Sequence, residues 1–507
     1  MMRKSALVVR PKSGQAGQNW RTRPKAPDAR QTNAEVRERM CDYVTEPRWR
    51  ITPQMGFSAA FLRIAVIGLT AVFFSAGITS VYAYASGEAV WVRKFDGPAG
   101  RADYGVDIAM DASKNVYVAG GIDDYGVDGD FGLIKYKPNG RRVWFRRYSA
   151  AGRDHPESPV AVGIDGKGAV YVAGSVEIED NDDFQIIKYS PSGAVKWMRR
   201  YGAPGKSEDA VTAMAVSSQG DVYVAGVSDR FQGRQFDYLT VKYNAAGEKK
   251  WVRRYDGPAH REDWANDLAI DKKGNAYITG YSVGTGASSQ YLTIKYDRRG
   301  RLKWRRRVGD SGANTAKAIA VTGGGNIFVT GTSYSSDGAH NLTVKYGPKG
   351  GRQWTRRYAG SEPGNYSGDG IALGRDGSVY VTGESLNFST GRTDIAAIKY
   401  DAQGRQVWVQ VYGGQADLDY EFSSAGSDRN GNLYIAGMFE GFDRKADIFA
   451  VKYSGDGVPL WDRDYAGRGN VEDRVNSLAV RSDGFAYITG STYSKGNENI
   501  VTIKYAP

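Results

Sequence analysis

Two acidic stretches stand out as groups of residues that could do chemistry. They read IDDYGVDGDFG and VEIEDNDDFQ. Carboxylates at this density can hold Ca²⁺ or attract a cationic partner. Neither spacing matches an EF-hand loop, so a solvated acidic surface is an equally good interpretation. The candidate ligand-binding residues are Asp123, Asp124, Asp128, Glu177, Glu179, Asp180 and Asp182.

The other residue types that carry chemistry are few. The three histidines, His155, His260 and His340, fall in different copies of an internal repeat, so a three-histidine metal site is not expected. The stretch GDSGA at residues 309–313 resembles a serine-protease nucleophile loop, but no His or Asp is arranged around it in a readable pattern. The only cysteine is Cys41. We therefore assign no catalytic, cofactor or metal-ligand residue, with Ca²⁺ at the acidic stretches as the one ion considered.

The elements that must position any site come from a repeat of 50 to 54 residues. In each copy a Tyr ends an apolar run, a Gly follows four residues later, and a Trp stands four residues after the Gly. The triplets are Tyr136, Gly140, Trp144; Tyr189, Gly193, Trp197; Tyr243, Gly247, Trp251; Tyr296, Gly300, Trp304; Tyr346, Gly350, Trp354; Tyr400, Gly404, Trp408; and Tyr453, Gly457, Trp461. An eighth Trp, Trp91, precedes the first triplet, and an eighth Tyr, Tyr505, follows the last.

Each copy contains four short apolar runs bounded by Gly, Asp, Asn or Ser, as in AVTAMAVS, DVYVAG, DYLTVKY and KKWVRRY. These runs predict four antiparallel strands, with the Gly in a hairpin between the third and fourth. One such sheet cannot cover both of its faces, so consecutive copies must stack. Because the repeat begins with a fourth strand at Trp91 and ends with a third at Tyr505, we predict an all-β, eight-bladed β-propeller over residues 86–507, closed by the N-terminal strand in the last blade.

The units resemble the secreted bacterial beta-propeller repeats called SBBP repeats, through runs such as LAIDKKGNAYITG and YLTIKYDRRG, and more loosely the blades of quinoprotein propellers. The resemblance covers residues 91–505. It implies a propeller and an extracellular or cell-envelope location, but no settled activity, and its usual number of blades is seven. A quinoprotein would bind its quinone on the axis, but the hairpins here are shorter. We interpret the Trp residues as packing between blades.

Two further patterns recur with the repeat. An acidic residue stands 17 positions before the Gly of the second run in five copies, at Asp103, Glu157, Asp209, Asp263 and Asp473. Recurrence in many blades favours a structural role, such as accepting hydrogen bonds from backbone N–H groups in a turn. Arg pairs in the fourth strand, as in WMRRY, are interpreted as protection of exposed strand edges, with a basic belt for anionic polymers as the alternative.

The segment before the repeats divides in two. Residues 1–54 are basic and lack apolar periodicity, which predicts a disordered leader or an over-extended start. Residues 55–85 contain an uncharged run from Ile64 to Ala85, which predicts a signal peptide cut after Ala85 or, alternatively, a membrane anchor. Of the net charge of +12, 8 charges lie in residues 1–63. The nearly balanced remainder argues against nucleic-acid binding.

These patterns predict an exported, monomeric scaffold without catalytic activity that binds a protein or polysaccharide at the cell envelope. An enzyme of quinoprotein or glycan-cleaving type on the same scaffold is the alternative. Contact with a membrane is expected only through residues 64–85, if they are not removed. The recognition face is expected to be the one with the loops between blades and between second and third strands, because these loops vary most.

Overall fold

A computed structural model describes residues 87–507 except residues 123–128, 150–156, 179–180, 204–206, 230–234, 287, 310–311, 361–363, 414–417, 442–443, 468–470 and 495. The predicted leader at residues 1–54 and the predicted signal or anchor at residues 55–85 lie outside the described residues. Within the described part, no helix is long and apolar enough to cross a membrane.

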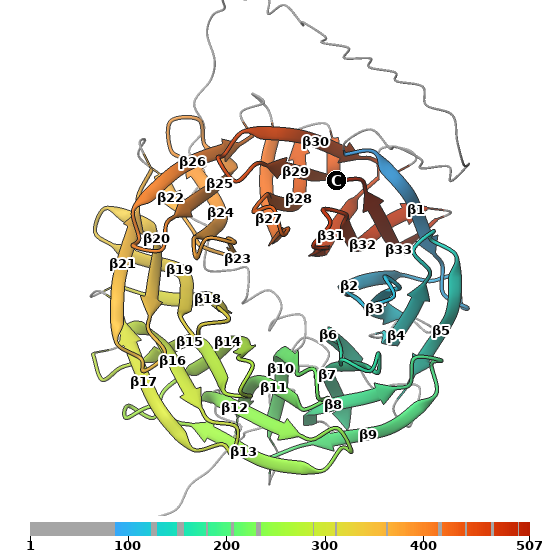
Figure 1. The fold of residues 1–507 in the computed structure, drawn as a ribbon, viewed down its shortest axis with the longest axis horizontal. Coiled ribbons are helices and arrows are strands. Elements are labelled where there is room, and N and C mark those ends of the chain that lie inside the picture. Colours follow the sequence, from blue (N-terminus) through green and yellow to red (C-terminus); the bar gives the residue numbers. More distant parts are fainter. Residues whose placement is uncertain are drawn as a thin grey trace, which may run out of the picture. The chain divides into compact units, whose positions relative to one another are not determined.

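Eight antiparallel sheets surround a common axis, each as one blade of a propeller (Figure 1). From the axis outward, blades 1 to 4 are β2 (Asp103–Met110), β3 (Val116–Ile122), β4 (Asp130–Tyr136), β5 (Arg142–Tyr148); β6 (Glu157–Ile164), β7 (Val170–Ile178), β8 (Asn181–Tyr189), β9 (Val195–Tyr201); β10 (Glu208–Val216), β11 (Val222–Asp229), β12 (Phe236–Tyr243), β13 (Lys249–Tyr255); and β14 (Asp263–Ile270), β15 (Ala276–Val283), β16 (Ser289–Tyr296), β17 (Leu302–Val308).

Blades 5 to 8 continue the ring in the same order. They are β18 (Asn314–Val321), β19 (Ile327–Ser335), β20 (Gly338–Tyr346), β21 (Arg352–Tyr358); β22 (Gly364–Tyr366) with β23 (Gly370–Leu373), β24 (Val379–Asn387), β25 (Arg392–Tyr400), β26 (Gln406–Tyr412); β27 (Leu418–Ser427), β28 (Leu433–Gly441), β29 (Arg444–Tyr453), β30 (Pro459–Tyr465); and β31 (Asp473–Val480), β32 (Ala486–Ser494), β33 (Asn497–Tyr505), β1 (Ala89–Phe95). Only in blade 6 is the innermost strand of the described chain split in two.

The ring closes as the sequence predicts, because β1 pairs with β33 as the outer strand of blade 8. The closing hairpin reproduces the others across the two ends of the repeat region. In blade 1, the Lys137 N–H donates to the Arg141 carbonyl at 2.8 Å, and the Ala506 N–H donates to the Glu88 carbonyl at the same distance. Gly87 has φ +78°, within the range of +76° to +86° for the seven hairpin glycines. Gly87 therefore completes an eighth triplet with Tyr505 and Trp91.

The blades are held together by a contact that the Tyr, Gly and Trp spacing encodes. Each Trp ring lies against the hairpin Gly of the following blade, so that a Cβ on Gly247 would come within 2.9 Å of Trp197. The Trp91 indole N–H also donates to the Pro138 carbonyl at 3.0 Å. Most of these Trp rings are buried, and Trp91 is 6% exposed. The interpretation of the Trp residues as packing between blades is confirmed.

The Arg pairs of the fourth strands have two separate structural roles. The first Arg binds the next blade: the Arg253 guanidinium donates to the Gly300 carbonyl at 2.5 Å and lies over the Trp251 ring. The same bond recurs at 2.5 to 2.7 Å in five other junctions. The second Arg binds its own blade, as in the 2.6 Å ion pair of Arg254 with Asp237. Protection of the outer strand edges stays a prediction, and these bonds within the ring are a role of the Arg side chains that the sequence interpretation did not include.

The recurring acid at the start of the innermost strand is a turn acceptor, as predicted. Asp103, Asp209, Asp263 and Asp473 are fully buried, and each accepts a hydrogen bond from a backbone N–H six residues earlier. In blade 5 Asn314 takes the same position. Burial raises the pKa of Asp263 to about 6.

Candidate functional site

The structure describes only two of the predicted ligand-binding residues. Asp123, Asp124, Asp128, Glu179 and Asp180 lie outside the described residues. Glu177 and Asp182 pair directly across β7 and β8. Burial raises the pKa of Asp182 to about 7, and the charges of Glu177 and Glu208 add to the effect. The two acidic residues therefore lie opposite each other near the end of this hairpin.

The two histidines that the structure describes, His260 and His340, lie apart from each other. His260 follows β13 and lies 2.8 Å from Asp256, whereas His340 is buried in β20 and lies 3.1 Å from Asp337. His155 and part of GDSGA lie outside the described residues. Neither described histidine belongs to a group of metal ligands.

One group of three carboxylates lies at the junction of blades 3 and 4. Oxygens of Asp237, Asp256 and Asp263 are within 4.8 Å of one another. Each has a protein partner, because Arg254 binds Asp237, His260 binds Asp256, and the Gly257 N–H donates to Asp263. Protein groups therefore bind all three carboxylates.

The innermost strands carry a ring of irregular positions around the axis. In the innermost strand of seven blades the pairing skips one residue, which forms a β-bulge. In blade 6 the pairing is interrupted over residues 367–369 instead. The residues at this position, 14 before the Gly of the second strand, are Val106, Val160, Thr212, Asn266, Lys317, Asp369, Ser423 and Asn476.

Bulge side chains reach from one blade to the next around this ring. The Asn266 amide donates to the Ala316 carbonyl at 2.7 Å, and the Asn476 amide donates to the Gly105 carbonyl at 2.7 Å. Between blades 5 and 6 the contact becomes ionic, because Lys317 Nζ lies 2.7 Å from Asp369 Oδ1. Asp369 also accepts a hydrogen bond from the Ser367 hydroxyl.

Three more charged residues join this pair from blades 6 to 8. Glu384 in β24 accepts a hydrogen bond from the Phe422 N–H at 3.4 Å, and Glu421 and Arg474 stand two positions before the bulge of blades 7 and 8. In blades 1 to 4, neither the bulge position nor the position two residues before it holds a charged residue. Tyr104 and Trp264 stand two residues before the bulge in blades 1 and 4. We name Lys317, Asp369, Glu384, Glu421 and Arg474 the axial charged cluster.

The cluster perturbs the protonation of its own members. Burial raises the pKa of Glu384 to about 7, and the negative charge of Asp369 adds to this. The pKa of Lys317 is also raised, chiefly by Asp369. Burial raises the pKa of Glu421, which Arg474 opposes. A carboxyl group that titrates near pH 7 beside a second carboxyl can donate or accept a proton, and such groups concentrate at functional sites.

The sequence interpretation missed this cluster because its members are spread over residues 317–474. A signal for it was present. When the copies are aligned on the Gly of the second strand, Lys317 and Asp369 are the two charged residues in the bulge column. The cluster lies toward the start of the innermost strands, on the predicted recognition face. It belongs to blades 5 to 8, whereas the predicted acidic residues belong to blades 1 and 2.

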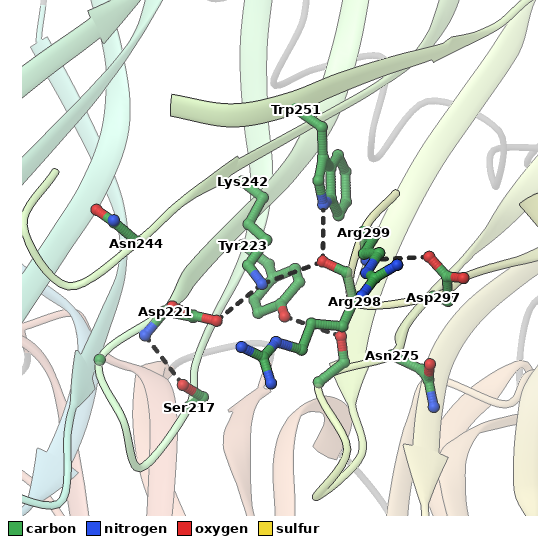
Figure 2. Close-up of polar contacts among 12 residues, drawn as sticks. Ser217, Asp221, Tyr223, Lys242, Asn244, Trp251, Asn275, Asp297, Arg298 and Arg299 are labelled. Atoms are coloured by element: carbon green, nitrogen blue, oxygen red, sulfur yellow. Dashed lines mark hydrogen bonds and ion pairs between the residues drawn. The ribbon is translucent and has the colours of Figure 1, made fainter. Parts of the chain in front are cut away.

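A pocket of about 890 Å³ lies on the opposite face, between the Gly turns of blades 3 and 4. Figure 2 shows its inner wall, where Lys242 binds Asp221 at 2.8 Å and the Arg298 carbonyl at 3.3 Å. The Trp251 indole N–H donates to the same carbonyl at 3.2 Å. These bonds fix the hairpin at residues 297–301 against blade 3. Half of the ten residues that line the pocket are basic: Lys242, Lys250, Arg298, Arg299 and Arg301.

The fold defines the class of protein as an eight-bladed β-propeller. Residues 251–286 match the SBBP beta-propeller repeat, which confirms the resemblance for this part of the chain. No curated protein matches the chain in sequence.

Solved structures are similar to this chain at low sequence identity. Sqt1 from Chaetomium thermophilum is 10% identical, with 83% of this chain and 99% of that chain covered and a TM-score of 0.50. The WD40 domain of SCAP from fission yeast is 10% identical, with coverage of 83% and 98% and a TM-score of 0.46. The beta-propeller domain of the Trilobed protease from Pyrococcus furiosus is 9% identical, with coverage of 68% and 95% and a TM-score of 0.41. The similarity to Sqt1 concerns the fold alone.

Proposed function

We propose that this protein is an exported propeller that binds a polysaccharide or protein partner at the cell envelope, without catalysing a reaction. The observation that carries the proposal is the axial charged cluster. It stands where the repeat is broken, so packing of the repeat does not account for its charges. The remaining blades keep uncharged residues at the same inner-strand positions.

The axial position suits recognition for a physical reason. Inner strands of all blades converge there, so residues from four blades act on one ligand while the packed blades hold them still. Carboxylates of Asp369 and Glu384 accept hydrogen bonds, and Lys317 and Arg474 donate them. Such a set binds a polar ligand that offers both donors and acceptors, which describes sugar hydroxyls and peptide groups.

Export is supported by where the propeller begins. Gly87 already forms part of the closing hairpin through the bond between Ala506 and Glu88. A cut after Ala85 would therefore remove nothing that this bond or Gly87 uses. N-terminal sequencing of the exported protein is expected to read from Ser86. Retention of Met1 or Met55 would contradict the cut, and the anchored alternative would then stand.

Binding at the axis is tested with a pair of nearly isosteric substitutions that remove charge, Asp369→Asn with Glu384→Gln. Dissociation constants for envelope glycans and envelope proteins are measured by calorimetry with the parent and the variant. We expect at least a tenfold loss of affinity, with a cooperative melting transition that shows the ring is still folded. The matched control, Glu88→Gln with Asp456→Asn, removes the same charge from exposed turns on the other face. Equal binding by both variants would exclude the axial site.

The acidic stretches of blades 1 and 2 form a second proposed recognition sector. Like charges directly opposite across two strands are destabilising, as for Glu177 and Asp182, and a cation would relieve them. Replacing the seven predicted acids by Asn or Gln is expected to leave the fold intact and abolish binding of Ca²⁺ or a basic partner. If calorimetry of the parent shows no Ca²⁺ binding, and parent and variant capture the same basic partners, the sector is solvated surface.

The enzyme alternative draws on one observation, the pKa of about 7 for Glu384 beside Asp369. Glycan-cleaving enzymes pair a carboxylic acid that donates a proton with a second, ionised carboxylate. If the protein cleaves glycans, Glu384→Gln should abolish cleavage while glycan binding persists. Release of reducing sugar ends from envelope glycans is the measurement. No release by the parent protein would leave the binding function as the proposal.

A further inference from the structure

The Gly turns of blade 4 carry a concentration of positive charge that none of the other blades repeats. Its two turns read DKKGN and DRRGR, whereas the corresponding hairpin turns elsewhere are KPNGR, SPSGA, NAAGE, GPKGG, DAQGR and SGDGV. The outer strand that follows contains LKWRRRV. We name Lys272, Lys273, Arg298, Arg299 and Lys303 the basic sector.

The charges of the basic sector are exposed and uncompensated by bonding. All five side chains are exposed, and among the described residues no carboxylate pairs with any of them. Other positive charges nearby are already bound: Lys242 to Asp221, Lys250 to Glu248, and Arg301 to Asp297. Arg298 and Arg299 are therefore the cations lining the pocket that have no carboxylate partner among the described residues.

The pocket presents these guanidinium groups in a fixed arrangement. The backbone of Arg298 is held by both Lys242 and Trp251, so the hairpin cannot swing away from blade 3. Figure 2 shows the Arg298 side chain reaching out between Asp221 and Asn275 with no bond drawn to its guanidinium. Because a guanidinium is planar and always charged, it binds carboxylate, sulfate and phosphate groups in pairs of hydrogen bonds.

We propose that the basic sector binds an anionic polysaccharide, with Arg298 and Arg299 receiving its charged groups at the pocket and Lys272, Lys273 and Lys303 following the chain beside it. The sector lies on the face opposite the axial charged cluster and uses none of its residues. The proposal rests on the proposed export only in choosing a glycan over another anionic polymer.

Nucleic acid fits this surface less well. Binding of single strands relies on exposed aromatic rings on which bases stack, and the aromatic residue of the pocket, Trp251, is 7% exposed. Duplex readers usually insert a helix or a ribbon into a groove. The charges here surround a recess between two hairpins, which accommodates a sugar unit with its anionic group.

The test compares two variants of equal charge. Arg298→Gln with Arg299→Gln changes the proposed site, and Lys137→Gln with Arg141→Gln removes two charges from the symmetry-related hairpin of blade 1, where both are exposed. Binding to heparin oligosaccharide is measured by calorimetry at several salt concentrations, with single-stranded DNA and polyphosphate as comparators. Lys250 and Glu248 remain unchanged, so their ion pair stays intact in both variants.

We expect the blade 4 variant to bind heparin at least tenfold more weakly. Its salt dependence should flatten by about one unit of slope for each guanidinium that no longer binds the polymer. The blade 1 variant should bind as the parent does. Equal weakening in both variants would mean that net charge alone attracts heparin, and the sector would not be a site. Absence of heparin binding at low salt, or tighter binding of DNA or polyphosphate than of heparin, would also overturn the proposal.

Discussion

The buried carboxyl group of Asp263 makes a prediction whose sign depends on pH. It is fully buried, accepts the Gly257 N–H, and faces the carboxylate of Asp237. Burial raises its pKa from 3.8 to about 6. Between these two values the folded protein holds a proton that the unfolded chain releases, so this group makes stability fall as pH rises from about 4 to 6.

The magnitude follows from the shift. A difference of about two pKa units corresponds to about 3 kcal/mol at 1.36 kcal/mol per unit, which is the stability that ionisation of Asp263 removes at pH 7. Asp263→Asn keeps an oxygen for the Gly257 N–H and has no charge. We therefore expect the variant to be more stable than the parent by about 1 to 3 kcal/mol at pH 7, with the gain largely absent at pH 4.

Blade 5 supplies the matched reverse change, because Asn314 occupies the equivalent position. Its amide donates to the carbonyls of Ser289 at 3.0 Å and Gly312 at 2.6 Å. Asn314→Asp would place a carboxylate against these carbonyl oxygens, so it should destabilise the protein more at pH 7 than at pH 4. Urea unfolding followed by Trp fluorescence at both pH values measures the two effects. If Asp263→Asn lowers stability equally at both pH values, the effect does not depend on ionisation of Asp263 and the reasoning fails.

Three further predictions concern the blade junctions. Trp91→Ala should cost about 3 to 5 kcal/mol, measured by urea unfolding, because the ring is 6% exposed and leaves a cavity; a loss below about 1 kcal/mol would mean that the junction collapses around the change. Gly247→Ala should cost more than Gly391→Ala, since both have positive φ but only the first meets a Trp197 ring at 2.9 Å, and equal melting temperatures would contradict this. A chain that lacks residues 87–95 should lose the cooperative unfolding of the ring, and calorimetry like that of the parent would show that closure by β1 is dispensable.

The fold was readable because its information is local and repeated. Tyr, Gly and Trp at spacings of four describe one hairpin and its contact with the next blade, so one set of physical rules applies at every copy. The phase of the repeat, with Trp91 at one end and Tyr505 at the other, was enough to predict closure in the last blade. The bonding partners of individual side chains were harder to predict from the sequence. In WVRRY the two Arg residues are neighbours, but successive strand residues point to opposite sides, and this sends Arg253 to the next blade and Arg254 to Asp237.

The candidate site is the opposite case, because its residues are those that differ from their counterparts in the other blades. Repeated residues such as Asp103 or Trp91 serve the ring and are explained by it. Acidic density pointed to loops in blades 1 and 2, where length and composition vary freely. Lys317 differs from its counterparts at a bulge that the innermost strands of seven blades share, and Asp369 holds the aligned position in blade 6, where the pairing is interrupted instead. A charge at such a position must be balanced by a partner from another blade, as Lys317 and Asp369 balance each other at 2.7 Å. In a propeller, an unrepeated charge in the inner-strand column therefore indicates a candidate site, separately from the dense runs of acids in the loops of blades 1 and 2.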